Sequence, residues 1–109
     1  MADALNPRVR VPASARKGEV IEIKTLVQHP MESGQRKDAG GALVPRFIVN
    51  RLTCRFNGRL VLDARLEPAI AANPYLVFHF RASESGSFEF AWTDDAGAVV
   101  TLTQKLTVT

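Results

Sequence analysis

The sequence predicts an all-β fold, an immunoglobulin-like antiparallel β-sandwich of about seven strands. Apolar and polar residues alternate with a period of two through most of the chain, which is typical of strands with one buried face. The strands are short and separated by turn residues, as in sandwiches of this class. At 109 residues the chain has the length of one domain. We expect residues 1–109 to form it, with residues 1–6 disordered.

The predicted strands are taken in chain order. Seven segments carry the alternation: 8–11, 19–28, 47–56, 60–66, 75–82, 87–92 and 99–108. In the sixth, Phe88, Phe90 and Trp92 occupy the positions that should face the core. Between the fourth and fifth, residues 67–74 have room for only one short helical turn, because Pro68 suits a first turn and Asn73-Pro74 ends it.

Turn residues predict how the strands pair. Asp95-Ala96-Gly97 suits a three-residue loop that would place Trp92 opposite Val100 and Phe90 opposite Leu102. Glu84-Ser85-Gly86 could close a hairpin of the same kind, or carry the chain from one sheet to the other. Asn57-Gly58 is the strongest hairpin signal, but a strict two-residue turn would mix core and solvent positions on one face. We therefore predict one extra residue, in a bulge or a longer loop, that aligns Phe56, Cys54 and Leu52 with Leu60, Leu62 and Ala64.

Composition excludes several classes of protein. Hydrophobic residues make up 46% of the chain and charged residues 23%, as in an ordinary globular domain. No apolar run approaches the length of a membrane span. The net charge of +3 would allow a polyanion partner, but the basic residues are spread along the strands, which favours a solvated outer face over a nucleic-acid patch. The N-terminus lacks the apolar segment of a secretory signal, so taken alone the chain looks cytosolic.

The reactive side chains give no catalytic pattern. Cys54 lies on the predicted inner face and should behave as a small buried hydrophobe. His29, Met31, Cys54 and His79 suggest copper on a β-sandwich, but they do not follow the blue-copper order along the chain. Asp94-Asp95 suits a tight turn in which the carboxylates bind backbone N–H groups. We expect no enzyme activity, no cofactor and no metal site.

The long connection from His29 to Val44 is the sequence-level candidate for function. Its conservative interpretation is a solvated loop, with Gly34 and Gly40-Gly41 supplying positive φ angles. The alternative is a docking surface, because loops longer than about 12 residues in compact domains are often functional. In that interpretation the loop presents both rigid and flexible apolar groups, and charged side chains surround them. The interface candidates are His29, Pro30, Met31, Glu32, Arg36 and, on a nominally outer strand face, Tyr75.

Three blocks carry a resemblance to a known family. They are KGEVIEIKTLVQHPMESGQR at residues 17–36, IAANPYL at residues 70–76 and FAWTDDAG at residues 90–97. In order and spacing they resemble the SoxZ family, the smaller subunits of bacterial sulfur-compound carrier complexes. The similarity spans nearly the whole chain.

The resemblance implies an immunoglobulin-like scaffold that is not itself catalytic. SoxZ-like proteins pair with SoxY, whose C-terminal Gly-Gly-Cys-Gly-Gly arm carries thiosulfate-derived intermediates between periplasmic enzymes, with which the complex makes transient contact. The expected state is a heterodimer or a higher oligomer, co-exported with a signal-bearing partner and free of nucleic acid and membrane. This chain ends Lys105-Leu106-Thr107-Val108-Thr109, without such an arm. Alternatives are a small metal or thiol redox protein and a free-standing binding domain.

Overall fold

The computed structural model describes residues 7–27, 34–66 and 75–109. Three sequence-based predictions lie outside the described residues: the disorder of residues 1–6, the short helical turn in 67–74, and the candidates His29 to Glu32. No described segment forms a helix of the length and apolarity that a membrane crossing requires.

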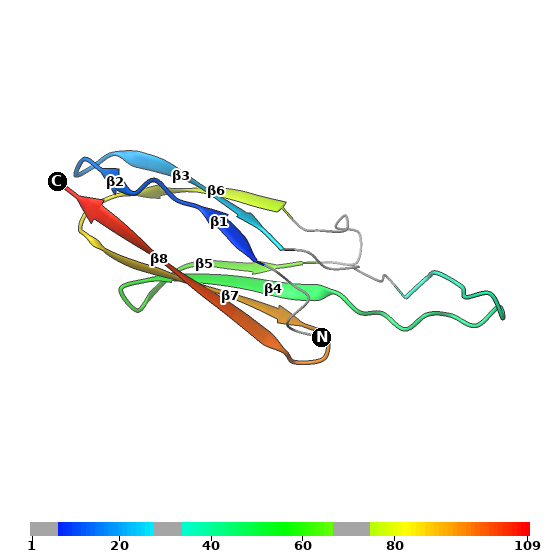
Figure 1. Cartoon of the computed structure of the whole chain (residues 1–109). Coiled ribbons are helices and arrows are strands. Elements are labelled where there is room, and N and C mark those ends of the chain that lie inside the picture. The colour runs from blue at the N-terminus through cyan, green and yellow to red at the C-terminus, as the bar shows by residue number, and fades with distance from the viewer. Residues whose placement is uncertain (1–6, 28–33, 67–74) are drawn as a thin grey trace.

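The described chain is an all-β sandwich of two sheets, which confirms the predicted fold class (Figure 1). The three-stranded small sheet has the order β1 (Arg8–Arg10), β3 (Val20–Leu26), β6 (Tyr75–Arg81). The five-stranded large sheet has the order β2 (Ser14–Ala15), β8 (Val99–Val108), β7 (Gly86–Asp94), β4 (Val49–Phe56), β5 (Arg59–Arg65). Neighbouring strands are antiparallel except β2, which runs parallel to β8. The seven predicted strands are present, whereas β2 was not predicted because two residues are too few to show an alternation.

Aromatic side chains join the two sheets in the core. Phe80 of the small sheet lies 4.9 Å from Phe56 and 5.0 Å from Phe88 of the large sheet, measured between ring centroids. Along β7 the ring of Phe90 stacks between those of Phe88 and Trp92, at 6.1 and 6.0 Å. Pairs at these separations add to the stabilisation that burial provides. Because β6 and β7 belong to different sheets, Glu84-Ser85-Gly86 is a crossover between sheets and not a hairpin turn.

The predicted register of β7 and β8 is confirmed. Trp92 pairs with Val100 and Phe90 with Leu102 across the Asp95-Ala96-Gly97 turn. Gly97 has a φ of 82°, the left-handed conformation that this loop requires.

The predicted register of β4 and β5 is confirmed in part. Leu52 pairs with Ala64 and Cys54 with Leu62, and one extra residue is accommodated in a bulge. The predicted alignment of Phe56 with Leu60 is wrong, because Phe56 pairs with Arg59 and Leu60 with Arg55. The Asn57-Gly58 turn keeps its two-residue form, with φ angles of 51° and 84°, so the extra residue is Val61, inside the strand.

Residues 34–46 form a hairpin extension that reaches beyond the sandwich (Figure 1). Lys37 and Leu43 make an antiparallel bridge, and the Val44 amide donates to the Arg36 carbonyl at 2.8 Å. At the tip the Asp38 carboxylate accepts from the amides of Gly40 and Ala42 at 2.9 and 3.0 Å. The described part of the predicted loop is therefore a hairpin-like excursion closed by one β-bridge and by hydrogen bonds at its tip.

Candidate functional site

Two of the six predicted interface residues lie in the described chain. Arg36 is exposed and belongs to the hairpin extension. Tyr75 begins β6, on the outer face of the small sheet, and is 56% exposed. The structure places these residues on different elements, one on the hairpin extension and one on the small sheet. Of the two, Tyr75 belongs to the exposed apolar surface and to the basic groove that are described below.

Exposed apolar side chains concentrate on the two edge strands β5 and β6. Of the seven large hydrophobic residues that are exposed in the described chain, four lie on these strands: Leu60, Val61, Tyr75 and Val77. We call these four residues the apolar edge surface. Among the described strands, each of these two has a neighbour on one side only, so its other side presents backbone groups that a partner could pair. An apolar set on open strand edges is typical of a protein-binding surface.

The core beneath this surface is incompletely covered. The inward-facing residues of β6, Leu76, Phe78 and Phe80, are only half-buried, and so is Leu62 of β5. By contrast, Phe88 and Phe90 in the middle of the large sheet are fully buried. A cleft of about 130 Å³ opens between β5 and β6, lined in part by Val61 and Phe80. A partner covering these edges would complete the burial of the half-buried strands.

Asp95 fixes the root of the hairpin extension to the large sheet. Its carboxylate receives two hydrogen bonds from the Arg46 guanidinium, at 2.9 and 3.0 Å. The Asn50 side-chain amide and the Ile48 backbone amide donate to the same carboxylate at 2.9 and 3.2 Å. The Arg46 hydrogen bonds lower the pKa of Asp95 the most, and with the other donors they bring it to about 2. The sequence predicted a local turn role for Asp95, but its partners come from the start of β4.

Asp94 does have the predicted turn role. Its carboxylate is 3% exposed and accepts hydrogen bonds from the amides of Ala96 and Ala98, at 2.9 and 3.0 Å.

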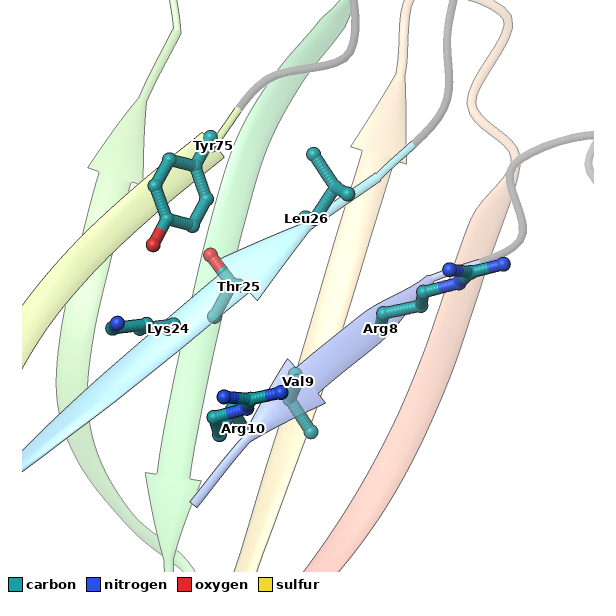
Figure 2. Close-up of a pocket in the computed structure, with 7 residues that line it drawn as sticks. All are labelled: Arg8, Val9, Arg10, Lys24, Thr25, Leu26 and Tyr75. Carbon is teal, nitrogen blue, oxygen red and sulfur yellow. The ribbon is translucent and has the colours of Figure 1, made fainter.

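A basic groove lies on the outer face of the small sheet (Figure 2). It has a volume of about 410 Å³ and is lined by Arg8, Val9, Arg10, Lys24, Thr25, Leu26 and Tyr75. Arg10 pairs with Lys24 across β1 and β3, and Arg8 pairs with Leu26, which in turn pairs with Tyr75. Two of the three cationic side chains, Arg8 and Arg10, are neighbours on β1, and the third, Lys24, comes from β3.

From the sequence the basic residues were interpreted as a solvated outer face spread along the strands, and the three that line this groove were not singled out. Arg8 and Arg10 lie about 15 residues before Lys24, and only the pairing of β1 with β3 brings them together. The signal that could have found the groove is the alternation in both strands, which places all three cations on the polar face. The register needed to align them is a tertiary property.

The reactive residues lie as the alternation predicts. Cys54 is fully buried, and burial raises the pKa of its thiol to about 12. At neutral pH the thiol is therefore protonated and shielded by the core. His79 is exposed and lies 3.8 Å from the Glu22 carboxylate. Among the residues that the structure describes, no three His, Cys, Asp or Glu side chains form a group that could hold a metal ion.

Comparison with known proteins gives one family and several structural neighbours. The family model described as "Sulphur oxidation protein SoxZ" matches residues 9–105. No curated protein matches the sequence. The fold is similar to that of the sulfur carrier protein SoxY from Chlorobium limicola f thiosulfatophilum, with a TM-score of 0.67 and 11% identity, covering 94% of this chain and 78% of that chain.

Two further neighbours share the architecture. They are the superoxide reductase (neelaredoxin) from Ignicoccus hospitalis, with a TM-score of 0.68, 13% identity and coverage of 94% and 80%, and a putative superoxide reductase from Thermotoga maritima, with a TM-score of 0.67, 15% identity and coverage of 94% and 85%. At such low identities these likenesses concern the fold alone.

Proposed function

This chain belongs to the SoxZ family of sulphur oxidation proteins, and from that membership we propose that it is a non-catalytic scaffold subunit of a sulfur carrier complex. Its partner is a SoxY-like subunit whose C-terminal Gly-Gly-Cys-Gly-Gly arm carries covalent sulfur intermediates during thiosulfate oxidation. The likeness in fold to a sulfur carrier protein SoxY supports a pairing of two similar sandwiches. We further propose that the pair works in the periplasm and is exported together.

The apolar edge surface is the observation that carries this proposal. Leu60 and Val61 are 47% and 38% exposed on β5, and the inward side chains of β6 are half-buried beside them. Covering one large apolar side chain completely contributes about 1.5–3 kcal/mol before the costs of association. Obligate interfaces bury on the order of 2,000 Å² or more and resemble a divided core. Edges with incompletely covered core residues fit that kind of interface.

The state of Cys54 supports a carrier thiol on the partner. Sulfur transfer requires a thiolate that can be reached, because the thiolate is the nucleophile. Cys54 has no exposed surface, and its pKa is raised to about 12. A swinging arm satisfies both requirements, whereas a buried core thiol satisfies neither.

Co-expression with a SoxY-like subunit tests the proposal. We expect the wild-type chain to co-purify as a heterodimer, and the double variant Val61→Asp, Val77→Asp to bind the partner at least about 100-fold more weakly. The physical reason is that each carboxylate would be buried in an apolar interface without a counter-charge. Affinity is measured by titrating labelled partner with each purified chain.

Val99→Asp is the control for the effect of an aspartate at an exposed strand position outside the interface. Val99 is 54% exposed and lies on β8, away from the apolar edge surface, and the substitution adds the same side chain to a strand. Circular dichroism melting of all chains separates lost binding from lost folding. A double variant that folds and still binds the partner like the control would contradict the proposed interface. If the wild-type chain and the SoxY-like subunit elute separately at micromolar concentration, the scaffold role itself is contradicted.

A thiol redox protein is the competing candidate, and intact mass after thiosulfate turnover distinguishes it. Under the scaffold proposal the sulfur adduct appears on the partner only. An adduct on Cys54 would favour the thiol redox function instead.

A further inference from the structure

Like charges face each other on the outer surface of the small sheet. Arg10 and Lys24 are directly paired residues of β1 and β3, and Arg8 lies on the same face two residues before Arg10. Figure 2 shows the long side chains of Arg10 and Lys24 on the same side of the sheet. Like charges directly opposite each other on antiparallel strands destabilise the pairing. A protein that keeps such a pair bears a cost that an anionic ligand would offset.

The anions of the described residues leave most of this charge uncompensated. Glu22 lies 3.5 Å from Lys24, but it also lies 3.8 Å from His79 on β6. Within the described parts of the chain, neither Arg8 nor Arg10 has an ion pair. Three cations therefore line the groove, and in the described parts of the chain the carboxylate paired with one of them, Glu22, lies outside the groove lining and is also close to His79. The local field favours an anionic ligand.

The spacing of the two arginines fits an extended polypeptide. Alternate residues of a strand point to the same face and are about 6.8 Å apart, because the rise is about 3.4 Å per residue. Arg8 and Arg10 have this relation on β1. Two carboxylates at alternate positions of an extended segment repeat with the same spacing, and each can accept a charge-assisted hydrogen bond from a guanidinium.

The walls of the groove add an apolar contact. Leu26 pairs with Tyr75 across β3 and β6, next to the Arg8 position. Tyr75 is 56% exposed, so its ring is available to a ligand. The volume of about 410 Å³ exceeds what a single small ion needs, since a water molecule takes up only about 30 Å³. Charge and apolar surface therefore occur together, as at protein-binding sites.

We propose that the basic groove over β1 and β3 binds an extended acidic segment of a protein, with carboxylates at alternate positions facing Arg8 and Arg10 and an apolar side chain against Leu26 and Tyr75. This contact shares Tyr75 with the apolar edge surface, but its charged part lies on β1 and β3, away from β5, and it does not depend on the scaffold function proposed above. It forms quickly and is weakened by salt, since it depends on exposed charges.

Two labelled peptides of equal composition test the proposal on the full-length chain. In acetyl-Glu-Thr-Glu-Thr-Leu the carboxylates and the leucine share one face of an extended strand, and in acetyl-Glu-Glu-Thr-Thr-Leu they do not. Fluorescence anisotropy at 50 mM NaCl should show binding of the alternating peptide at least about fivefold tighter than the other. The double variant Arg8→Ser, Arg10→Ser should bind it at least about tenfold more weakly.

The double variant Arg55→Ser, Lys105→Ser is the control, since it removes the same charge from exposed strand positions on the large sheet. It should bind the alternating peptide like the wild-type chain. Equal affinity for both peptides, or equal losses in the two double variants, would show general charge attraction and overturn the proposal. Displacement of the peptide by sodium sulfate at least about tenfold more effectively than by NaCl of equal ionic strength would assign the groove to a small oxyanion and would also overturn it.

Discussion

The two sheets of the sandwich each pair two like charges, Arg51 with Arg65 on the large sheet and Arg10 with Lys24 on the small sheet, but they differ in how these charges are compensated. On the large sheet, the Arg51 guanidinium makes two hydrogen bonds of 2.8 Å to Asp63 on the neighbouring strand. On the small sheet, Arg10 faces Lys24. Both arrangements use exposed residues at directly paired or neighbouring strand positions, so the difference does not come from composition. It shows which charges stabilise the fold and which are available for binding.

The two sheets also differ in the number of partners that their charged groups have. The large sheet holds the hairpin extension through Asp95, whose carboxylate has four donors from Arg46, Asn50 and Ile48. Among the described residues, Lys24 of the small sheet lies 3.5 Å from the Glu22 carboxylate, and neither Arg8 nor Arg10 has an ion pair. Real proteins often break a local rule of sheet pairing at functional sites. The small sheet does so in its basic groove. On the large sheet Arg51 is also paired with a like charge, Arg65, but the Asp63 carboxylate accepts two hydrogen bonds from Arg51.

The largest expected effect on stability comes from breaking the best-paired charge of the large sheet. Asp95→Asn keeps the shape of the side chain but removes its charge and one of its acceptor oxygens. With the pKa of Asp95 lowered from a usual value of 3.8 to about 2, the charge contributes about 2 kcal/mol to folding. We expect the free energy of unfolding in urea to fall by about this amount.

Asp63→Asn serves as the comparison for Asp95→Asn. Its ion pair with Arg51 is exposed on both sides, so a smaller fall is expected. An equal fall in the two variants would mean that burial and the number of donors do not govern these pairs.

Acid should weaken the same contact in the wild-type chain. Because the folded pKa of Asp95 lies below its unfolded value, the stabilisation is present in full above about pH 4 and is lost as the pH falls toward 2. The difference in stability between wild type and Asp95→Asn should therefore shrink over this range, as measured by urea unfolding at a series of pH values. A difference that stays constant from pH 6 to pH 2.5 would assign the effect to packing and not to charge.

The sequence-based reasoning succeeded where the determinants are local. Alternation and turn chemistry predicted the sandwich, the pairing of Trp92 with Val100, and the burial of Cys54, because each depends on residues close along the chain. The position of the bulge at Val61 was missed, since the tight turn at Asn57-Gly58 and the burial of Phe56 compete, and only packing decides between them.

The candidate site was predicted less completely for a related reason. Tyr75 was found as an apolar residue on an outer face. Arg8 and Arg10 were not singled out, because their relation to Lys24 depends on which strands become neighbours. The partners of Asp95 lie 45 to 49 residues away, so no short motif could indicate them. Contacts of this kind depend on topology and cannot be read from spacing.

The smallest expected change in stability is the most informative for the comparison of the two sheets. It is a gain in the free energy of unfolding, whereas the substitutions on the large sheet cause losses. Arg10→Thr removes one member of the like-charged pair and puts a residue with high strand propensity in its place. Relief of the repulsion with Lys24 should raise the free energy of unfolding by up to about 0.5 kcal/mol, even though an exposed charged residue has been lost.

Arg55→Thr, on the large sheet, is the control for Arg10→Thr. Arg55 pairs with Leu60 and Glu89, so the same substitution should bring no such gain. Urea unfolding at low salt measures both, and the gain should disappear at 1 M NaCl, where the screening length falls to about 3 Å. If Arg10→Thr instead destabilises the chain at both salt concentrations, the arginine contributes to folding, and the two sheets do not differ in the way proposed.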